Sequence, residues 1–134
     1  MRHVTLPILL AFSSLPAAAQ DIDAGSALFA RHCATCHGAD ATGGGPMAPV
    51  LVVQPKDLTQ LSAENGGVFP MARVVARIDG GDPLVSHGSA MPVYGDFFAG
   101  RGRTLTAPDG TEIETSGPIA DLVAYLEHVQ GEEI

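Results

Sequence analysis

The sequence predicts a small all-α fold of about four helices joined by long loops, with room for a small β-hairpin near residues 103–115. Apolar residues recur at helical spacing in four segments, most of which stop at a glycine. The chain also has 16 glycines, 10 prolines and no tryptophan, a composition that favours loops over regular structure. We therefore expect one domain in which helices account for only part of the chain.

The first two predicted helices lie in the N-terminal half of the chain. Apolar spacing predicts a helix over residues 24–32, with Asp21 or Asp23 as its N-cap. A short second helix is expected over residues 60–65, where Gly66-Gly67 would end it. Both helices are expected to be short.

The other two predicted helices carry clear apolar stripes. The third would begin at Pro70 and end before Gly80, and the fourth would run over residues 118–130. Between them, residues 103–106 and 111–115 alternate in polarity around a Pro-Asp-Gly turn, which predicts the hairpin.

Residues 1–19 have the pattern of a secretory signal peptide. A short basic start precedes about twelve mostly apolar residues, and alanines at positions 17–19 precede the expected cleavage before Gln20. The apolar stretch is too short to cross a bilayer core of about 30 Å, so an uncleaved anchor is the less favoured alternative. We expect residues 20–134 to form the mature domain, exported to the periplasm, with no membrane span.

The chain is acidic, with a formal net charge of -8 at pH 7. Cleavage of the signal peptide would remove one basic residue, Arg2, and so change this charge from -8 to -9. A strongly negative protein is repelled by phosphate groups, so nucleic acid and anionic lipid are excluded as expected partners.

Residues Cys33-Ala34-Thr35-Cys36-His37 form a Cys-X-X-Cys-His box, which contains both cysteines of the chain. This pattern is typical of haem c attachment, since two thiols on one helical turn can each add to a haem vinyl group while the histidine binds iron. Zinc would need two further ligands at metal-site spacing, and the other histidines occur singly. A thioredoxin-like dithiol would need a βαβ context. We therefore expect one haem c, bound through Cys33 and Cys36, with His37 as proximal ligand.

Two further segments accompany the box. Residues 91–95 read Met-Pro-Val-Tyr-Gly, and residues 121–126 lie in the last predicted helix. Together with Gly25 and Phe29 ahead of the box, they are similar to the motifs of class I (mitochondrial-type) monohaem cytochromes c over essentially the whole mature chain. The resemblance implies the small cytochrome c fold, in which the last helix crosses the first. Leu122 and Tyr125 are then expected to pack on Gly25 and Phe29, with the glycine permitting a close approach of the two backbones.

The sixth iron ligand is expected to be Met91, in the loop that resembles the family's methionine-ligand loop. Met47 lies close behind His37 in the chain, and Met71 sits on a helical apolar stripe where a core role is the default. Met71, His87 and an open or water-bound iron remain alternatives. Methionine ligation would stabilise ferrous iron and close the metal to substrates.

The resemblance also suggests groups around the ligands. In the family, the ring of the proximal histidine donates to the carbonyl of a proline after the box, for which Pro46 is the expected match and Pro49 the alternative. Tyr94 is a candidate donor to a haem propionate. The candidate cationic partners of the propionates are Lys56, Arg73, Arg77, Arg101 and Arg103.

These expectations predict a periplasmic electron carrier, not an enzyme, that passes single electrons between redox partner proteins and exists as a monomer. The alternatives are a haem enzyme or gas-binding sensor with an open distal site, and an electron-transfer subunit of a larger respiratory or dehydrogenase complex. The acidic charge suggests partners with a cationic or mixed-charge docking face. The segment over residues 96–117 is longer than a minimal member needs, which suggests a docking feature or an addition without a role in binding.

Overall fold

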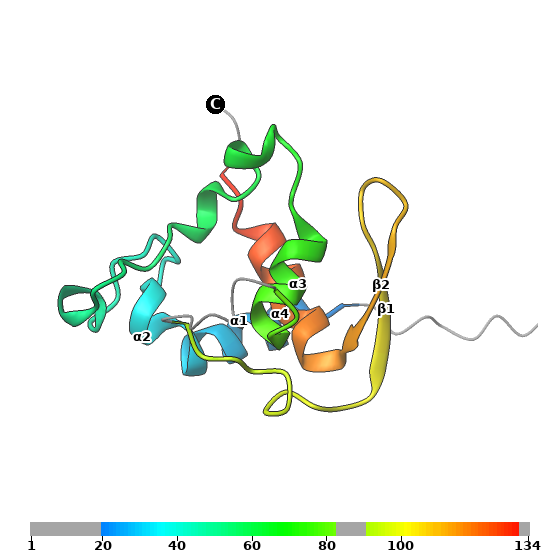
Figure 1. Cartoon of the computed structure of the whole chain (residues 1–134), viewed down its shortest axis with the longest axis horizontal. Helices are drawn as coiled ribbons and strands as arrows, with labels where there is room; N and C mark the ends of the chain where they lie inside the picture. The colour runs from blue at the N-terminus through cyan, green and yellow to red at the C-terminus, as the bar shows by residue number, and fades with distance from the viewer. Residues whose placement is uncertain (1–19, 83–90, 132–134) are drawn as a thin grey trace, which may run out of the picture.

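The computed structural model describes residues 20–82 and 91–131 (Figure 1). The predicted signal peptide over residues 1–19 and the candidate ligand His87 lie outside the described residues. In chain order the elements are α1 (Ile22–His32), α2 (Ala34–His37), the 3-10 turns η1 (Ala48–Val50), η2 (Leu58–Gln60) and η3 (Ala63–Asn65), α3 (Met71–Asp79), β1 (Gly102–Thr106), β2 (Glu112–Ser116) and α4 (Gly117–His128). No helix in the described part of the chain is long and apolar enough to cross a membrane.

Helix α1 begins at a side-chain cap. The carboxylate of Asp21 accepts the backbone N–H of Ala24 at 3.0 Å, which satisfies one of the free donors of the first turn. Of the two predicted caps, the structure therefore selects the earlier one, and the helix starts two residues sooner than the apolar spacing indicated. It ends at Cys33, where α2 follows directly.

Helices α1 and α4 cross at a glycine, as the resemblance implied. A Cβ atom on Gly25 would overlap the carbonyl oxygen of Asp121, so the two backbones approach more closely than any other residue would allow. The rings of Phe29 and Tyr125 pack at a centroid distance of 5.1 Å beside the crossing. The side chain of Asp121 also accepts the backbone N–H of Asp21 at 2.9 Å. The predicted crossing is confirmed.

The core lies around α4, which packs against both α1 and α3. Met71 is 6% exposed and lies in this core, which confirms the structural role expected from its place on an apolar stripe. Helix α3 ends at Gly80, whose left-handed φ of 94° closes the last turn. The largest fully buried side chains are Phe29, Ile119, Leu122 and Val123.

The predicted second helix over residues 60–65 is wrong. The structure has two 3-10 turns there, η2 and η3, followed by Gly66 in the left-handed conformation. The carboxylate of Asp57 accepts the N–H of Thr59 at 2.9 Å, and the amide of Asn65 donates to the carbonyl of Val68 at 2.8 Å. Such local side-chain bonds compete with an α-helix, and a segment this short cannot offset the cost of nucleating one.

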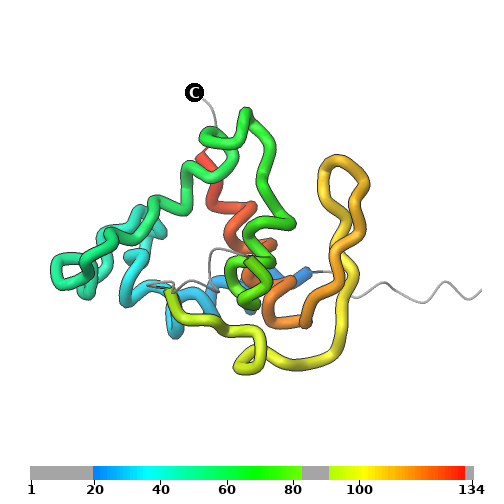
Figure 2. The backbone as a smooth tube through the Cα atoms, in the orientation of Figure 1, coloured from blue at the N-terminus to red at the C-terminus, as the bar shows by residue number. Residues whose placement is uncertain are grey.

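The predicted hairpin is confirmed as the antiparallel pair β1 and β2, which stands at one side of the helices (Figure 2). Leu105 of β1 lies opposite Ile113 of β2 and is buried against the helical core. Because an isolated two-stranded hairpin is marginally stable in water, this anchor is what keeps it folded. The last strand leads directly into α4, whose first turn is capped by Ser116.

Candidate cofactor site

The Cys-X-X-Cys-His box lies at the junction of α1 and α2. The carbonyl of Cys33 accepts the backbone N–H groups of Cys36 at 3.1 Å and of His37 at 2.9 Å, so the three residues share one helical turn. All three side chains are partly buried, and neither thiol is in a disulfide. One turn of backbone thus presents two thiols and an imidazole, which is the donor set that covalent haem attachment requires.

Two observations oppose the interpretations of the motif as a redox dithiol and as a zinc site. Burial and the neighbouring Cys36 thiol raise the pKa of Cys33 to about 11. This thiol is protonated at neutral pH, whereas the reactive cysteine of a redox dithiol has a lowered pKa. Within residues 20–82 and 91–131, no group of three or more His, Cys, Asp or Glu side chains could hold a metal ion, which opposes zinc.

The imidazole of His37 is oriented by a main-chain carbonyl. Its Nδ1 lies 3.0 Å from the carbonyl oxygen of Lys56, which can only accept, so Nδ1 is the protonated donor. In the neutral imidazole with this tautomer, Nε2 carries the lone pair that can bind iron. The prediction that Pro46 or Pro49 supplies the acceptor is wrong, because the acceptor carbonyl belongs to the residue that follows Pro55.

The path of the loop after the box explains this difference. Gly45 donates its N–H to the carbonyl of Cys36 at 3.1 Å, and Met47 donates to the carbonyl of Thr35 at 3.0 Å. Pro46 is therefore held along the backbone of α2, between these two bonds. After Pro46 the chain turns through η1, and it returns to the imidazole only at Lys56, whose carbonyl accepts from the ring.

Two glycines permit the close packing of this loop. A Cβ atom on Gly45 would come within 2.5 Å of the carbonyl oxygen of Cys36. Gly43 has a left-handed φ of 93°, and a Cβ atom there would lie 2.5 Å from the carbonyl oxygen of Pro55. Gly43 also donates its N–H to the carbonyl of His37 at 2.7 Å. Larger residues at these positions would displace the segment that orients the imidazole.

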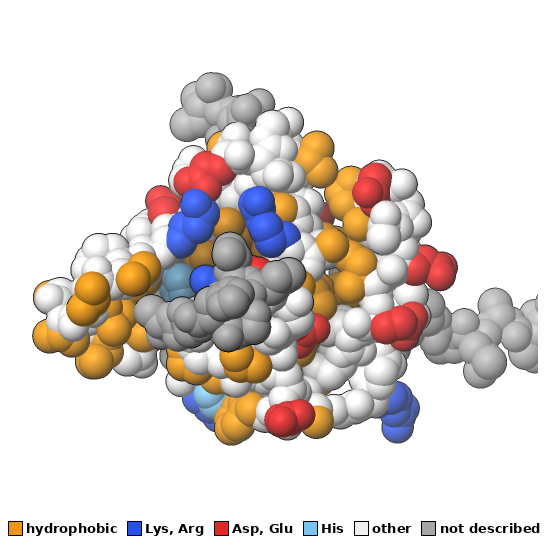
Figure 3. Space-filling view, viewed as in Figure 1, with side chains coloured by type: hydrophobic (Ala, Val, Ile, Leu, Met, Phe, Trp, Pro, Cys, Tyr) orange, Lys and Arg blue, Asp and Glu red, His pale blue; other side chains and the backbone are white. Residues whose placement is uncertain are grey.

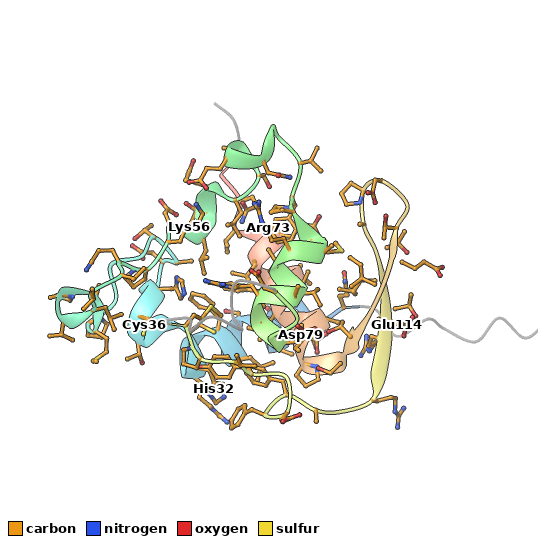
Figure 4. The ribbon with its side chains drawn as sticks, in the orientation of Figure 1. His32, Cys36, Lys56, Arg73, Asp79 and Glu114 are labelled. Carbon is orange, nitrogen blue, oxygen red and sulfur yellow. The ribbon has the colours of Figure 1, made fainter. Side chains whose placement is uncertain are left out.

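The loop that contains Met91 is held against the box. The backbone N–H of Tyr94 donates to the carbonyl of Ile78 at 2.8 Å, and its hydroxyl donates to the carbonyl of His32 at 3.1 Å. Figure 4 shows His32 and Cys36 on consecutive helices at this end of the molecule. Burial, together with the nearby Cys33 and Cys36 thiols, raises the pKa of Tyr94. The methionine loop and the box are therefore neighbours in space.

The three methionines among the described residues occupy different environments. Met91 is partly buried and packs against the hydrophobic core. Met71 belongs to that core, and Met47 is 42% exposed on the loop after the box. Of the three, Met91 is the one that lies in the loop that Tyr94 ties to the end of α1, next to the box.

An aromatic cluster that the sequence pattern did not predict fixes the loop after Met91 to α1. The ring of His32 meets Phe97 and Phe98 edge to face, at centroid distances of 5.0 and 5.4 Å. Phe98 also stacks on Tyr94 at 5.2 Å. The two adjacent phenylalanines, just after the methionine motif, were the signal available in the sequence. Their contacts with His32 give this histidine a packing role, one residue before the box.

Three of the predicted partners of the haem propionates, Lys56, Arg77 and Tyr94, have partners within the protein. The ammonium of Lys56 pairs with Glu64, and the guanidinium of Arg77 lies 3.4 Å from the carboxylate of Asp82. The hydroxyl of Tyr94 donates to a main-chain carbonyl. These contacts stabilise the loops around the site and reduce the freedom of the side chains to bind a further anion.

The residues present therefore fit a covalently held haem: two thiols, an imidazole with one nitrogen engaged, and a thioether in a neighbouring loop. The sequence profile described as Cytochrome c matches residues 22–130, which include every helix and both strands. The chain belongs to the cytochrome c family. Comparisons with curated proteins and with solved structures gave no significant match.

Family membership fixes the cofactor and the general role of this cytochrome c. Its cofactor is haem c, bound covalently, and its two cysteines lie in the attachment box. The four helices and the small two-stranded sheet form a small cytochrome c fold of the class I monohaem type. Cytochromes c are haem-dependent electron-transfer proteins that act with redox partner proteins, and members of the family are generally carriers, not enzymes.

Proposed function

We propose that this cytochrome c is a periplasmic carrier of single electrons whose one haem c is ligated by His37 and Met91. The observation that carries the proposal is the hydrogen bond from Tyr94 to the carbonyl of His32, because it ties the methionine loop to the helix that leads into the box. The pattern of residues 1–19 supports export, with cleavage before Gln20. We further propose that the mature protein is a monomer.

Each residue of the site has a definable task. Haem c supplies a reversible one-electron change between ferric and ferrous iron. Cys33 and Cys36 tether the group, and the bond from His37 to a main-chain carbonyl holds the imidazole in one orientation and strengthens it as a donor. The thioether of Met91 would favour ferrous iron and close the metal to substrates, so that electrons would be exchanged without a bond to substrate.

Replacement of Met91 by alanine tests the ligation. Methionine-ligated ferric haem has a weak far-red charge-transfer band, which we expect the Met91→Ala variant to lose. Met47→Ala is the matched control, because Met47 is 42% exposed on the other loop, and it should keep the band. A band that persists in Met91→Ala would refute the assignment, and reactivity of the unaltered protein with peroxide or a diatomic gas would support the open-site enzyme or sensor instead.

The location and the assembly state are tested on the native protein. The secreted chain should begin at Gln20 and weigh the polypeptide plus one haem, by mass spectrometry of the periplasmic fraction. Purification as a lone chain supports a free carrier. Purification only within a membrane-associated assembly would show that the protein is a subunit of a larger respiratory or dehydrogenase complex.

The acidic charge supports a redox partner with a cationic or mixed-charge docking face. The chain has a formal net charge of -8 at pH 7, so its long-range field attracts positive surfaces. We expect the association rate with the true partner to fall as ionic strength rises, because salt screens this attraction. An association rate that is independent of ionic strength would contradict this part of the proposal.

A further inference from the structure

The loop over residues 47–53, here called the apolar loop, holds valines in water. The exposed fractions are 70% for Val50 and 63% for Val53, and Val52 is fully exposed. Figure 3 shows apolar side chains gathered on the lobe at its left edge, with no charged side chain among them in that view. Figure 1 shows the corresponding part of the chain projecting beyond α2. A cluster of exposed valines on one projecting loop is a candidate contact surface.

The apolar loop has a defined shape of its own. The side-chain amide of Gln54 donates to the carbonyls of Ala48 at 3.1 Å and Leu51 at 2.8 Å, which closes the loop on itself. The N–H of Val50 donates to the carbonyl of Met47 at 3.1 Å, within η1. These bonds hold the valines outward in a preformed arrangement, so binding to them would require little further ordering.

The sequence around the apolar loop contains no charged residue. Residues 41–55 contain no Asp, Glu, Lys, Arg or His, although the chain as a whole has a formal net charge of -8. The nearest charged residues along the chain are Asp40 and Lys56, and Lys56 is paired with Glu64. A partner that contacts this loop therefore meets an uncharged apolar surface on a protein that is acidic overall.

The apolar loop is also continuous with the cofactor site. Its first residue, Met47, donates its backbone N–H to the carbonyl of Thr35, within the Cys-X-X-Cys-His box. Two residues earlier, Gly45 donates to the carbonyl of Cys36. A protein docked on the loop would thus lie against the part of the chain that carries the haem attachment.

We propose that the apolar loop is the surface on which the redox partner docks, and that the partner presents an uncharged apolar patch there with cationic groups farther out. The inference rests on the proposed electron-carrier function. Long-range charge would bring the partners together, and the valines would make the short-range contact. A second copy of the chain and an anionic membrane are both disfavoured as occupants, because the negative charge of this protein repels them.

The test measures electron exchange of the haem-loaded protein with two probes. One is a small blue-copper protein chosen for an uncharged, apolar surface over its copper ligand. The other is hexaammineruthenium, a small hydrophilic complex that needs no apolar contact. The variant is Val52→Ser/Val53→Ser. Both valine side chains are exposed, so replacing them should leave folding intact. The control is Val68→Ser, another valine, 47% exposed and outside the loop.

We expect the double variant to lower the second-order rate constant with the blue-copper protein by on the order of tenfold. Its rate with hexaammineruthenium and its haem spectrum should not change, and Val68→Ser should change neither rate. Gln54→Ala leaves every valine in place but removes the bonds that close the loop, so it should lower the blue-copper rate by a smaller factor.

An unchanged blue-copper rate in the double variant would overturn the docking proposal. So would valine-dependent dimerisation in sedimentation equilibrium, or valine-dependent binding to vesicles of zwitterionic and anionic phospholipid, since each would assign the loop to another occupant. Failure of the unaltered protein to exchange electrons with either probe would instead contradict the electron-carrier function itself. The two failures are therefore distinguishable.

Discussion

At the scale of single residues, the orientation of His37 depends on a group that any amino acid could supply. The acceptor is the main-chain carbonyl of Lys56, and the side chain of that residue faces away to pair with Glu64. What selects this carbonyl is the approach of the chain, which the glycine at position 43 permits. The orientation of the imidazole therefore depends on Gly43, which acts only by letting the chain approach closely.

Replacing Gly43 by alanine should change the reduction potential as well as the stability. The left-handed φ costs a non-glycine residue about 1–2 kcal/mol, and the new Cβ would also press on the carbonyl of Pro55. Displacement of the neighbouring acceptor would weaken the bond to His37 and make the imidazole a poorer donor to ferric iron. We expect a higher potential in a spectroelectrochemical titration and a lower midpoint in denaturant.

Gly66→Ala separates these two effects. Gly66 also has a left-handed φ, of 71°, but no atom beyond its two chain neighbours lies within 4 Å of where its Cβ would be. This variant should lose a similar amount of stability and keep the potential of the unaltered protein. Equal shifts of potential in both variants would show that the close approach at Gly43 does not orient the imidazole.

At the scale of elements, the crossing of α1 and α4 determines where the box lies, because α1 leads directly into it. Gly25→Ala tests this crossing. Alanine favours a helix by about 1 kcal/mol over glycine, but here the added methyl group would overlap the backbone carbonyl of Asp121. Overpacking against backbone costs about 1–3 kcal/mol or more, so we expect a net loss of stability in chemical denaturation.

Gly117→Ala is the matched control for the crossing, since Gly117 is also helical and begins α4. Its added Cβ would lie 3.6 Å from the nearest atom, the carbonyl oxygen of Arg101, which is an ordinary contact. The change in the free energy of unfolding should be within about 0.5 kcal/mol. If both variants were equally stable, the close contact of α1 with α4 would have no energetic weight.

The hairpin is a second element whose contribution can be measured. Leu105 is 3% exposed and joins the hairpin to the core. Leu105→Ala should lower the free energy of unfolding by about 2–5 kcal/mol, as large-to-small changes in cores do. Thr106→Ala, at an exposed position on the same strand, should have little effect. Equal effects in the two variants would show that the hairpin is not anchored at Leu105.

At the scale of the whole molecule, we expect the haem to supply part of the interior. Helices α1 and α3 both pack on α4, but residues 38–70 contain only 3-10 turns and loops. Domains of this size are stable by only about 5–15 kcal/mol, so the loss of contacts to a buried group is enough to unfold them. The long loops are suited to surround a flat ligand, and they have little regular structure to hold them without it.

A chain without haem should therefore lack a cooperative fold. We expect the Cys33→Ser/Cys36→Ser variant, purified free of haem, to show a broad thermal transition and reduced helical signal in circular dichroism, with binding of a hydrophobic dye. The intact haem-loaded protein, measured under the same conditions, is the reference. A sharp transition with native helical content in the haem-free chain would contradict a structural role for the cofactor.

The features that the sequence predicted correctly depend on local pattern. The box is a contiguous motif, and the apolar periodicity of the last two helices and the turn of the hairpin involve residues close together in the chain. The crossing at Gly25 was predicted from the resemblance. In that motif the glycine lets the two helix backbones approach closely, as they do here. The short segment over residues 60–65 was mispredicted, because polar side chains there outcompete a weak helical pattern.

By itself, the sequence determined the covalent chemistry of this cytochrome c, since the thiols and the imidazole are side chains at fixed spacing. Only the tertiary structure decided that Lys56 orients His37, that Phe97 and Phe98 pack on His32, and that the apolar loop stands in water. The physical reason is the same in each case. Every residue has a carbonyl and any valine can be buried or exposed, so these roles depend on where the chain returns in space, which no local pattern encodes.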